Sequence, residues 1–278
     1  MDRRMPDIGN ELHKRRVLDS KKDGGGALFT FVQPSVSQKL PYREQQYRLR
    51  RAVMKHHWLS THGSLLDTLE KGVAFPIMHV DWDPDVKQNH IQLLKPDDLG
   101  SDVYVQQGLY EEVKRIEPDI SFSDRDNIEH KAYIILGFKS LETGFSSVLE
   151  KTWRDWTGAR SIYLKLHDEH DLARITFYHR VAPVNQLDVF MYLVVVECWN
   201  VCPSNLIRAL DFVQRMRVER LNGYISIYRD LGSEDKDSNY HSESSSERES
   251  FPNSKYSRSS SPTLAPPSIG NELKLPAI

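Results

Sequence analysis

The run from Val189 to Trp199 (VFMYLVVVECW) must be covered on both sides wherever it lies in the folded chain. It has about 11 mostly apolar residues, whereas a membrane-spanning helix needs about 20. The three consecutive β-branched residues Val194, Val195 and Val196 favour an extended strand over a helix. Apolar side chains occupy both sets of alternate positions, so both faces of that strand need neighbours. The sequence therefore predicts a buried central strand here.

The segments around this run predict strands and helices within one domain. Residues 161–166, 172–181 and 189–199 are separated by short polar connections, which is typical of an antiparallel meander. Residues 205–221 follow with apolar side chains at helical spacing. Further strands are expected at 27–33, 75–80, 102–106, 131–138 and 224–228, and further helices at 42–58, 64–69, 109–116 and 141–156. This order favours an α+β fold: a single domain with a mixed, largely antiparallel sheet (meander about 161–199) packed by helices.

Composition changes sharply at both ends of this domain. Residues 1–26 carry basic clusters and end in three glycines, and residues 231–278 are rich in serine. Such segments bury too little apolar surface to offset the entropy lost on ordering. We expect a disordered basic N-terminal tail over 1–26, an α+β globular domain over 27–230 and a disordered Ser-rich C-terminal tail over 231–278.

The charge balance and the cysteine content indicate an intracellular protein. Lys and Arg number 37 against 39 Asp and Glu, which excludes a histone-like polycation. The chain has 2 cysteines, too few for a disulfide scaffold, and this is typical of a reducing compartment. Residues 1–26 have no apolar run of the kind that a secretory signal needs. We expect a cytoplasmic or nuclear protein that is not secreted and has no transmembrane segment.

One predicted helix, around residues 39–57, has an excess of positive charge. Its basic side chains are opposed by Glu44 alone, and aromatic residues are interleaved with them. This pattern suits the phosphates of nucleic acid or an acidic membrane surface. A solvated face paired with acids elsewhere, or a protein-docking face, would leave the same pattern. The candidate anion- or nucleic-acid-binding residues are Lys39, Arg43, Arg48, Arg50, Arg51 and Lys55.

Cys202 begins a short loop that resembles the phosphate loop of cysteine-dependent phosphatases. Arg208 stands six positions later, where a helix is predicted to start after the buried strand. The resemblance implies a phosphatase-like enzyme or an inactive relative centred on Cys202 and Arg208, with a phosphate held at the helix start and a lowered thiol pKa. Pro203 removes a backbone N–H that such a loop uses, and the loop has no glycine. A structural role, with Ser204 or Asn205 capping the helix, is the simpler interpretation.

Two polar segments contain the residue types of metal sites. Residues 79–85 alternate carboxylates as a calcium loop does, but Val86 and Gln92 stand where that loop needs glycine and glutamate. Residues 167–171 (HDEHD) lie between two predicted strands, where a polar connection is expected whatever its chemistry. The chain also lacks a glycine-rich phosphate motif and a Gly-x-Ser-x-Gly elbow. We therefore predict no metal site, no cofactor and no catalytic residues.

The two tails carry a repeated pentapeptide and possible modification sites. The sequence IGNEL occurs at residues 8–12 and again at 269–273. Isoleucine and leucine four positions apart share a helix face, so the repeat is either a bivalent docking motif or a coincidence between polar tails. The candidate docking residues are Ile8, Leu12, Ile269 and Leu273, and the candidate phosphorylation sites are Ser244, Ser246 and Ser261.

These patterns together predict a non-enzymatic intracellular interaction or structural protein, a folded domain with a basic surface and motif-bearing tails. Protein partners are expected, nucleic acid or an acidic membrane surface stays open, and a small-molecule substrate is not expected. One alternative is a nucleic-acid-binding or membrane-associated matrix-type assembly protein that uses residues 39–57. The second is the cysteine-phosphatase-like enzyme or pseudoenzyme.

Overall fold

Antiparallel pairing closes eight strands into a barrel in the computed structural model, which describes residues 18–19, 25–35, 40–82, 93–118, 130–141, 144–219 and 223–231. The strands pair in the order β5-β2-β4-β3-β9-β6-β8-β7, and β7 pairs again with β5. A two-residue strand, β1 (Leu18–Asp19), pairs with the end of β5. The barrel strands are β2 (Gly26–Pro34), β3 (Ser64–Thr68), β4 (Ile77–Asp81), β5 (Val103–Glu117), β6 (Ala132–Phe138), β7 (Leu172–Ala182), β8 (Tyr192–Cys198) and β9 (Tyr224–Asp230).

The barrel consists of two repeats with the same topology. The first repeat contains β2, α1 (Tyr42–Lys55), β3, β4 and β5, and the second contains β6, three short helices, β7, β8, α6 (Leu206–Glu219) and β9. Each repeat has the strand order of a ferredoxin-like sheet, β5-β2-β4-β3 in the first and β9-β6-β8-β7 in the second. Equivalent strands are four positions apart in an antiparallel ring and so run in the same direction. Equivalent hairpins therefore lie at the same end of the barrel.

The register of the strands repeats as well as their order. Tyr110 of β5 lies opposite Ala27 of β2, and Tyr228 of β9 lies opposite Tyr133 of β6. These two pairs occupy equivalent positions in the two repeats. The chain thus has an internal pseudo-two-fold axis along the barrel.

Aromatic side chains fill the inside of the barrel. An eight-stranded barrel leaves an interior just wide enough for side chains to fill. The ring of Phe31 lies 5.2 Å from the rings of both Phe75 and Phe190, and the ring of Phe29 lies 5.3 Å from that of Tyr110. The interior cluster consists of Ala27, Phe29, Phe31, Leu66, Phe75, Met78, Val80, Tyr110, Tyr133, Ile135, Tyr178, Val189, Phe190, Leu193, Val195 and Tyr228.

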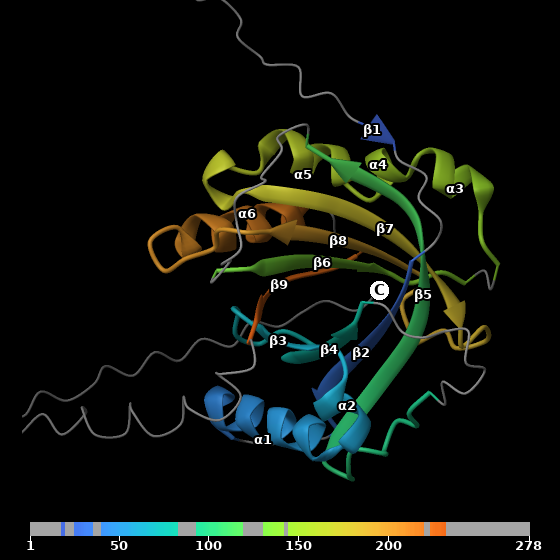
Figure 1. Ribbon diagram of the computed structural model, residues 1–278, viewed down its shortest axis with the longest axis vertical. Coiled ribbons are helices and arrows are strands. Elements are labelled where there is room, and N and C mark those ends of the chain that lie inside the picture. Colours follow the sequence, from blue (N-terminus) through green and yellow to red (C-terminus); the bar gives the residue numbers. More distant parts are fainter. Residues whose placement is uncertain are drawn as a thin grey trace, which may run out of the picture. The chain divides into compact units, whose positions relative to one another are not determined.

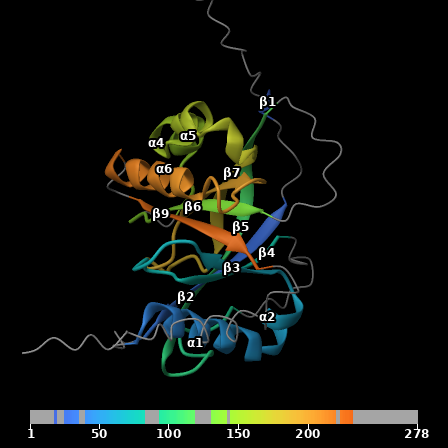
Figure 2. The same ribbon diagram turned by 90° about the vertical axis from the view of Figure 1, so that its left-hand side faces the viewer.

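Helices cover two opposite sides of the barrel (Figures 1 and 2). On the first repeat, α1 buries Leu49 and Val53, which are four positions apart on one helix face, and α2 (His57–Thr61) follows it. On the second repeat the covering helices are α3 (Ser147–Lys151), α4 (Trp153–Trp156), α5 (Ala159–Lys165) and α6, and a 3₁₀ turn (Asp168–His170) leads into β7. Strands beneath helices therefore face the barrel interior on one side and a helix layer on the other.

The predicted fold class was wrong, because the sheet is a closed barrel in which every barrel strand pairs antiparallel with its neighbours. Residues 161–166 do not begin a meander: most of them lie in α5, where Ile162, Tyr163 and Leu166 are buried at helical spacing. Residues 109–116 lie in β5 and not in a helix. Residues 64–69 were expected to be helical but contain β3, because Leu65 and Leu66 are buried on opposite sides of the barrel wall.

The prediction of a buried strand with neighbours on both sides was confirmed, although in a closed barrel no strand is central. β8 lies between β6 and β7, and Val194, Val195 and Val196 are all buried. Helices at 42–55 and 206–219 and strands at 26–34, 132–138, 172–182 and 224–230 also match predicted elements.

A buried charge at the centre of this wall should prevent folding. Val195 points into the barrel and is 4% exposed, so Val195→Asp would place a carboxylate among aromatic rings without a partner. The cost is several kcal/mol, against a total stability of about 5–15 kcal/mol for a domain. Circular dichroism should show no cooperative thermal transition for Val195→Asp, while Val218→Asp, on the exposed side of α6, melts like wild type. A cooperative wild-type-like melt of Val195→Asp would contradict the barrel assignment.

Candidate functional site

Two hairpins close one end of the barrel with aromatic residues. We call this the hairpin end; it consists of residues 69–76 between β3 and β4 and residues 183–191 between β7 and β8. The rings of Phe75 and Phe190, one from each hairpin, pack edge to face with centroids 5.8 Å apart. The Tyr228 hydroxyl donates to the Phe75 carbonyl oxygen at 2.8 Å, and the Tyr110 hydroxyl donates to the Phe190 carbonyl oxygen at 2.8 Å. These contacts are equivalent in the two repeats and fix both hairpins.

Arg180 places a buried positive charge at the hairpin end. It is 5% exposed and lies two residues after Tyr178, on the inward face of β7. Its guanidinium donates to the carbonyl oxygen of Val189 at 2.5 Å and to that of Val184 at 3.5 Å, and its Nε atom has no hydrogen-bond partner. Among the described residues, no carboxylate pairs with it. Burial lowers the pKa of Arg180, while Tyr110 favours its charged form.

The first repeat has a neutral residue at the position equivalent to Arg180. The Thr68 N–H donates to the Pro76 carbonyl oxygen, as the Arg180 N–H donates to the Met191 carbonyl oxygen, so Thr68 and Arg180 are equivalent. The buried charge is therefore a departure from the internal symmetry and not a requirement of the barrel.

A second unpaired polar atom belongs to Gln106 of β5. Gln106 lies opposite Phe31 and so faces the barrel interior, at the position where the second repeat has Tyr224. Its side-chain oxygen is buried without a hydrogen-bond partner. Buried polar atoms nearly always bond to protein, water or ligand, so Gln106 Oε1 and Arg180 Nε mark positions where a bound molecule can add contacts.

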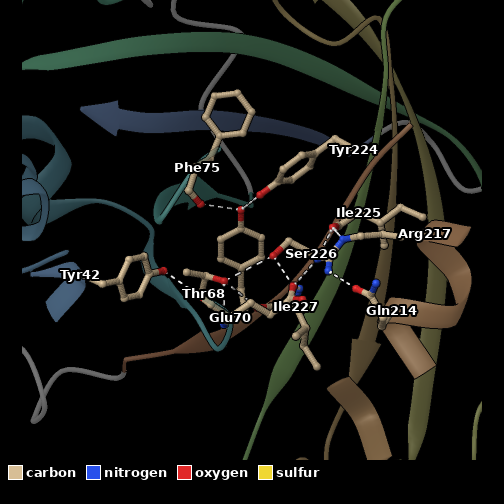
Figure 3. Close-up of polar contacts among 11 residues, drawn as sticks. Tyr42, Thr68, Glu70, Phe75, Gln214, Arg217, Tyr224, Ile225, Ser226 and Ile227 are labelled. Atoms are coloured by element: carbon tan, nitrogen blue, oxygen red, sulfur yellow. Dashed lines mark hydrogen bonds and ion pairs between the residues drawn. The ribbon is translucent and has the colours of Figure 1, made fainter. Parts of the chain in front are cut away.

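Glu70 ties the first hairpin to α6 and β9 (Figure 3). Its Oε2 atom accepts hydrogen bonds from Arg217 Nη2 at 2.6 Å, from the Ser226 hydroxyl at 2.6 Å and from the Ile227 N–H at 3.1 Å. The Tyr42 hydroxyl of α1 donates to the Glu70 carbonyl oxygen at 2.5 Å. Because this carboxylate and its cation satisfy each other, the Glu70 cluster positions the hairpin and offers little to a ligand.

Tyr224 links that cluster to the aromatic closure of the barrel. Its ring stacks on Phe190 at 5.6 Å, and its hydroxyl lies 2.5 Å from the Tyr228 hydroxyl. Burial raises the pKa of Tyr224 to about 12, so the phenol is neutral at physiological pH. The hairpin end therefore combines aromatic surfaces, neutral phenols and one unpaired cation.

The opposite end of the barrel carries a charge cluster that is paired. Glu197 of β8 is 4% exposed and lies 2.8 Å from Lys131 and 2.6 Å from Arg174, and the Trp199 indole N–H donates to it at 3.0 Å. Burial raises the pKa of the Glu197 carboxyl, but the two cations outweigh burial and hold that pKa below its usual value. This end is a structural ion-pair cluster.

The predicted basic helix exists, but its cations have different partners. Arg48 pairs with Glu44 at 2.8 Å, and Arg50 forms an ion pair with Asp67 of β3. For Arg51 and Lys55 no ion pair or hydrogen bond joins either side chain to another described residue. Arg43 is exposed near the start of α1, and Lys39 lies outside the described residues. On this helix Arg48 and Arg50 are thus held in ion pairs, and Arg51 and Lys55 have no partner among the described residues.

The loop from Cys202 to Arg208 is an ordinary helix start. The Asn205 side-chain oxygen accepts a hydrogen bond from the Cys202 N–H at 3.0 Å. Arg208 pairs with Glu169 at 2.6 Å instead of turning toward the thiol. The Ser204 hydroxyl, 3.0 Å from the thiol, lowers the Cys202 pKa, but the loop forms no ring of N–H groups around a phosphate.

The HDEHD segment and the helix start after β8 lie together. Glu169, in the 3₁₀ turn before β7, accepts hydrogen bonds from Asn200 and Asn205 through its carbonyl oxygen. Residues 168–170 form that turn, which agrees with the predicted polar connection into β7. In the described part of the chain no three His, Cys, Asp or Glu side chains gather as metal ligands would.

Several predicted sites lie outside the described residues. These are the docking residues Ile8, Leu12, Ile269 and Leu273, the phosphorylation sites Ser244, Ser246 and Ser261, and residues 83–85 of the calcium-like segment. They remain predictions. Of the helices that the structure describes, none is both long enough and apolar enough to cross a membrane.

A family model matches residues 60–230, which cover the strands from β3 to β9. Its description is a domain of unknown function, DUF7153. The chain belongs to this family. No curated protein matches the chain.

Three solved structures illustrate what the DUF7153 barrel is similar to. An anthrone oxidase-like protein has a TM-score of 0.46 and 7% identity, covering 77% of this chain and 94% of that one. A Fusobacterium nucleatum protein named as a monooxygenase has a TM-score of 0.34 and 8% identity, covering 75% and 92%. A mutant chlorite dismutase from Candidatus Nitrospira defluvii has a TM-score of 0.32 and 13% identity, covering 74% and 90%.

The expectation of a non-enzymatic interaction or structural protein was wrong. The solved structures with which the barrel aligns are named as an oxidase-like protein, a monooxygenase and a chlorite dismutase. The cysteine-phosphatase alternative is not supported, because Arg208 pairs with Glu169 and the loop at Cys202 is a helix start. The ion pair of Arg50 does not test the basic helix as a binding surface, which stays a prediction.

The hairpin end was not predicted from the sequence, although the residue pattern of β7 indicated an inward-pointing Arg180. Period-2 alternation along β7 places Arg180 on the same face as Tyr178, which would have indicated an inward-pointing charge. Nothing in the sequence indicated the Glu70 cluster, because Arg217 and Ser226 are more than 140 positions away from Glu70 along the chain.

The Glu197 cluster predicts an acid-dependent loss of stability. Since the pKa of Glu197 is lowered by folding, its contribution is present above its unfolded value of about 4.3 and is lost as the pH falls through the lower folded value. Glu197→Gln should cost about 3–5 kcal/mol at pH 7 because Lys131 and Arg174 lose their partner, and the cost should shrink below about pH 4.

Urea unfolding of wild type and Glu197→Gln between pH 7 and pH 3 measures this difference. Glu219→Gln, at an exposed ion pair with Lys165, serves as the matched control and should change stability by less than about 1 kcal/mol. A Glu197→Gln cost that stays constant with pH would show that the ion pairs do not stabilise the fold.

Proposed function

We propose that the protein is an enzyme that binds a small aromatic anion at the hairpin end and stabilises negative charge on it through Arg180. One observation carries this proposal: Arg180 is a buried cation among aromatic side chains, and no carboxylate among the described residues pairs with it. A buried charge without a counter-ion destabilises a fold, so its presence requires a reason outside folding.

An anionic ligand would supply the missing charge. Arginine binds carboxylate and similar oxyanions through two parallel N–H···O bonds, which are stronger than its present bonds to two backbone carbonyl oxygens. The unused Nε–H points to such a geometry, because an anion can take this donor together with one of the terminal nitrogens.

The surroundings of Arg180 favour an aromatic ligand. Tyr110, Phe190 and Tyr224 present rings and neutral phenols at the same end of the barrel. Aromatic ligands pack on such rings edge to face or offset-stacked. A fixed cation in this poorly solvated setting would stabilise a phenolate or enolate form of the ligand more than water does, which is a basis for catalysis.

A ligand would reach Arg180 by displacing the 183–188 segment. This segment carries two exposed apolar side chains, Val184 and Leu187, and it contributes the weaker carbonyl contact to Arg180 at 3.5 Å. A ligand that displaced this segment would replace the Val184 carbonyl contact with its own bond to Arg180.

Replacing Arg180 separates a binding role from a structural role. Arg180→Met removes the unpaired charge and should stabilise the free protein, by up to about 4 kcal/mol, since apolar replacements of poorly paired buried charges do so. The same change should weaken binding of 2-naphthoate at least tenfold, whereas the neutral 2-naphthalenemethanol should bind weakly and equally to both proteins. Calorimetry gives the affinities and thermal melting gives the stabilities.

Arg215→Met, at an exposed ion pair on α6, is the control and should change neither quantity. The proposal fails if Arg180→Met is less stable than wild type and binds 2-naphthoate unchanged, because Arg180 would then only anchor the hairpin.

Charge stabilisation on a substrate can be followed directly. With anthrone as probe, an enzyme that stabilises the enolate should speed exchange of the methylene hydrogens with D₂O, observed by proton NMR. Wild type should accelerate this exchange, Arg180→Met should not, and Arg215→Met should behave as wild type. Equal exchange with wild type and Arg180→Met would remove Arg180 from any catalytic role.

A further inference from the structure

A groove separates α1 from the segment that leads into β5. Its volume is about 320 Å³, within the range of small-molecule sites. Side chains of α1 form one wall, and Gly100, Ser101 and Asp102 form the other. Leu49 and Val103, both buried, contribute an apolar floor.

The α1 wall of this groove is positively charged. Arg48, Arg51 and Lys55 line it, and their spacing of three and four residues places them on one helix face. Arg48 pairs with Glu44, but no ion pair joins Arg51 or Lys55 to another of the described residues. Against these three cations the lining contains one acid, Asp102, which leaves the groove with a net positive charge.

The distance between the first and last of these cations along α1 favours an anion with more than one charged group. Seven residues separate Arg48 from Lys55, which corresponds to about 10 Å along a helix axis. A single carboxylate reaches one or two of these side chains, whereas a diphosphate or triphosphate reaches all three. Arginine and lysine both bind phosphate oxygens well, the first through its planar fork and the second as a point charge.

The opposite wall adds a second requirement. A carboxylate such as Asp102 repels phosphate but accepts hydrogen bonds from hydroxyl groups. The apolar floor accommodates an uncharged ring. A ligand that satisfies all three surfaces has phosphates at one side and a hydroxyl-bearing, partly apolar body at the other.

We propose that this groove binds a small phosphorylated metabolite with free hydroxyl groups, of the nucleotide or sugar-phosphate class. This site is separate from Arg180, which points into the barrel, whereas α1 lies on the outer side of the first repeat. The groove volume matches one small molecule, and we propose that class of ligand over a polymer.

Calorimetric titration of the full chain with ATP and with inorganic pyrophosphate tests this proposal. Both should bind saturably, and affinity should fall as salt rises. The double variant Arg51→Glu, Lys55→Glu should lose at least tenfold in affinity for both probes. The control Lys139→Glu, Lys151→Glu makes the same charge change at exposed positions outside the groove lining and should retain wild-type affinity within about twofold.

Asp102→Asn distinguishes recognition of hydroxyls from general attraction of anions. Removing its charge should tighten pyrophosphate binding several-fold, because repulsion is lost, but should raise affinity for ATP by a smaller factor, because a hydroxyl loses its charged acceptor. Equal gains for the two probes would overturn the assignment of Asp102.

Three results would overturn the site itself. One is the absence of saturable binding of either probe at millimolar concentration. Another is equal weakening by the control double variant, which would show that net charge and not the groove attracts the anion. The third is retention of heparin or RNA without binding of ATP or pyrophosphate, which would assign this helix face to polymers.

Discussion

The contact between Phe75 and Phe190 on the pseudo-two-fold axis holds the two halves of this barrel in one arrangement. Each phenylalanine stands two residues before a barrel strand, and its backbone carbonyl oxygen accepts a hydrogen bond from a tyrosine in the last strand of the other repeat, Tyr228 for Phe75 and Tyr110 for Phe190. The carbonyl bonds fix where each hairpin ends, and the ring contact fixes how the hairpins meet. Aromatic side chains suit this task because they bury much area with few rotatable bonds.

Elements whose signal lies in neighbouring residues could be predicted from the sequence, whereas contacts between distant segments could not. β8 was predicted because the consecutive valines Val194 to Val196 favour a buried strand, and a basic helix was predicted at residues 42–58, where α1 lies. β5 was predicted in part as a helix, since Leu109 to Ile116 mixes inward and outward residues across two irregularities in its pairing with β7. Closure of the sheet was not predictable, because the β5–β7 pairing joins two strands that each already have another neighbour.

The candidate sites were likewise predictable only where their residues are close in the sequence. The basic face of α1 was visible in the sequence because its residues are neighbours on one helix, whereas the groove required the 99–103 segment, which is about 50 positions further along the chain. Arg180 was not selected because a single arginine in a strand has no pattern of its own. Its role depends on which groups surround it, and no carboxylate pairs with it among the residues that the structure describes. Only the folded chain shows which residues surround a buried side chain.

The internal symmetry shows that the barrel does not need a cation at the position of Arg180. Thr68 shows that the same backbone position closes the barrel with a neutral side chain, so the strand pairing does not need a cation there. Glu70 belongs to the hairpin that follows Thr68, and its carboxylate is bound to Arg217, which comes from a helix on the outside of the second repeat. The charge at the first hairpin is thus neutralised within the protein, whereas Arg180, beside the second, has no carboxylate partner among the described residues. Both repeats close the barrel with the same backbone hydrogen bonds, so the side chain at this position can differ between them. The first repeat has the neutral Thr68 there, and the second has the charged Arg180.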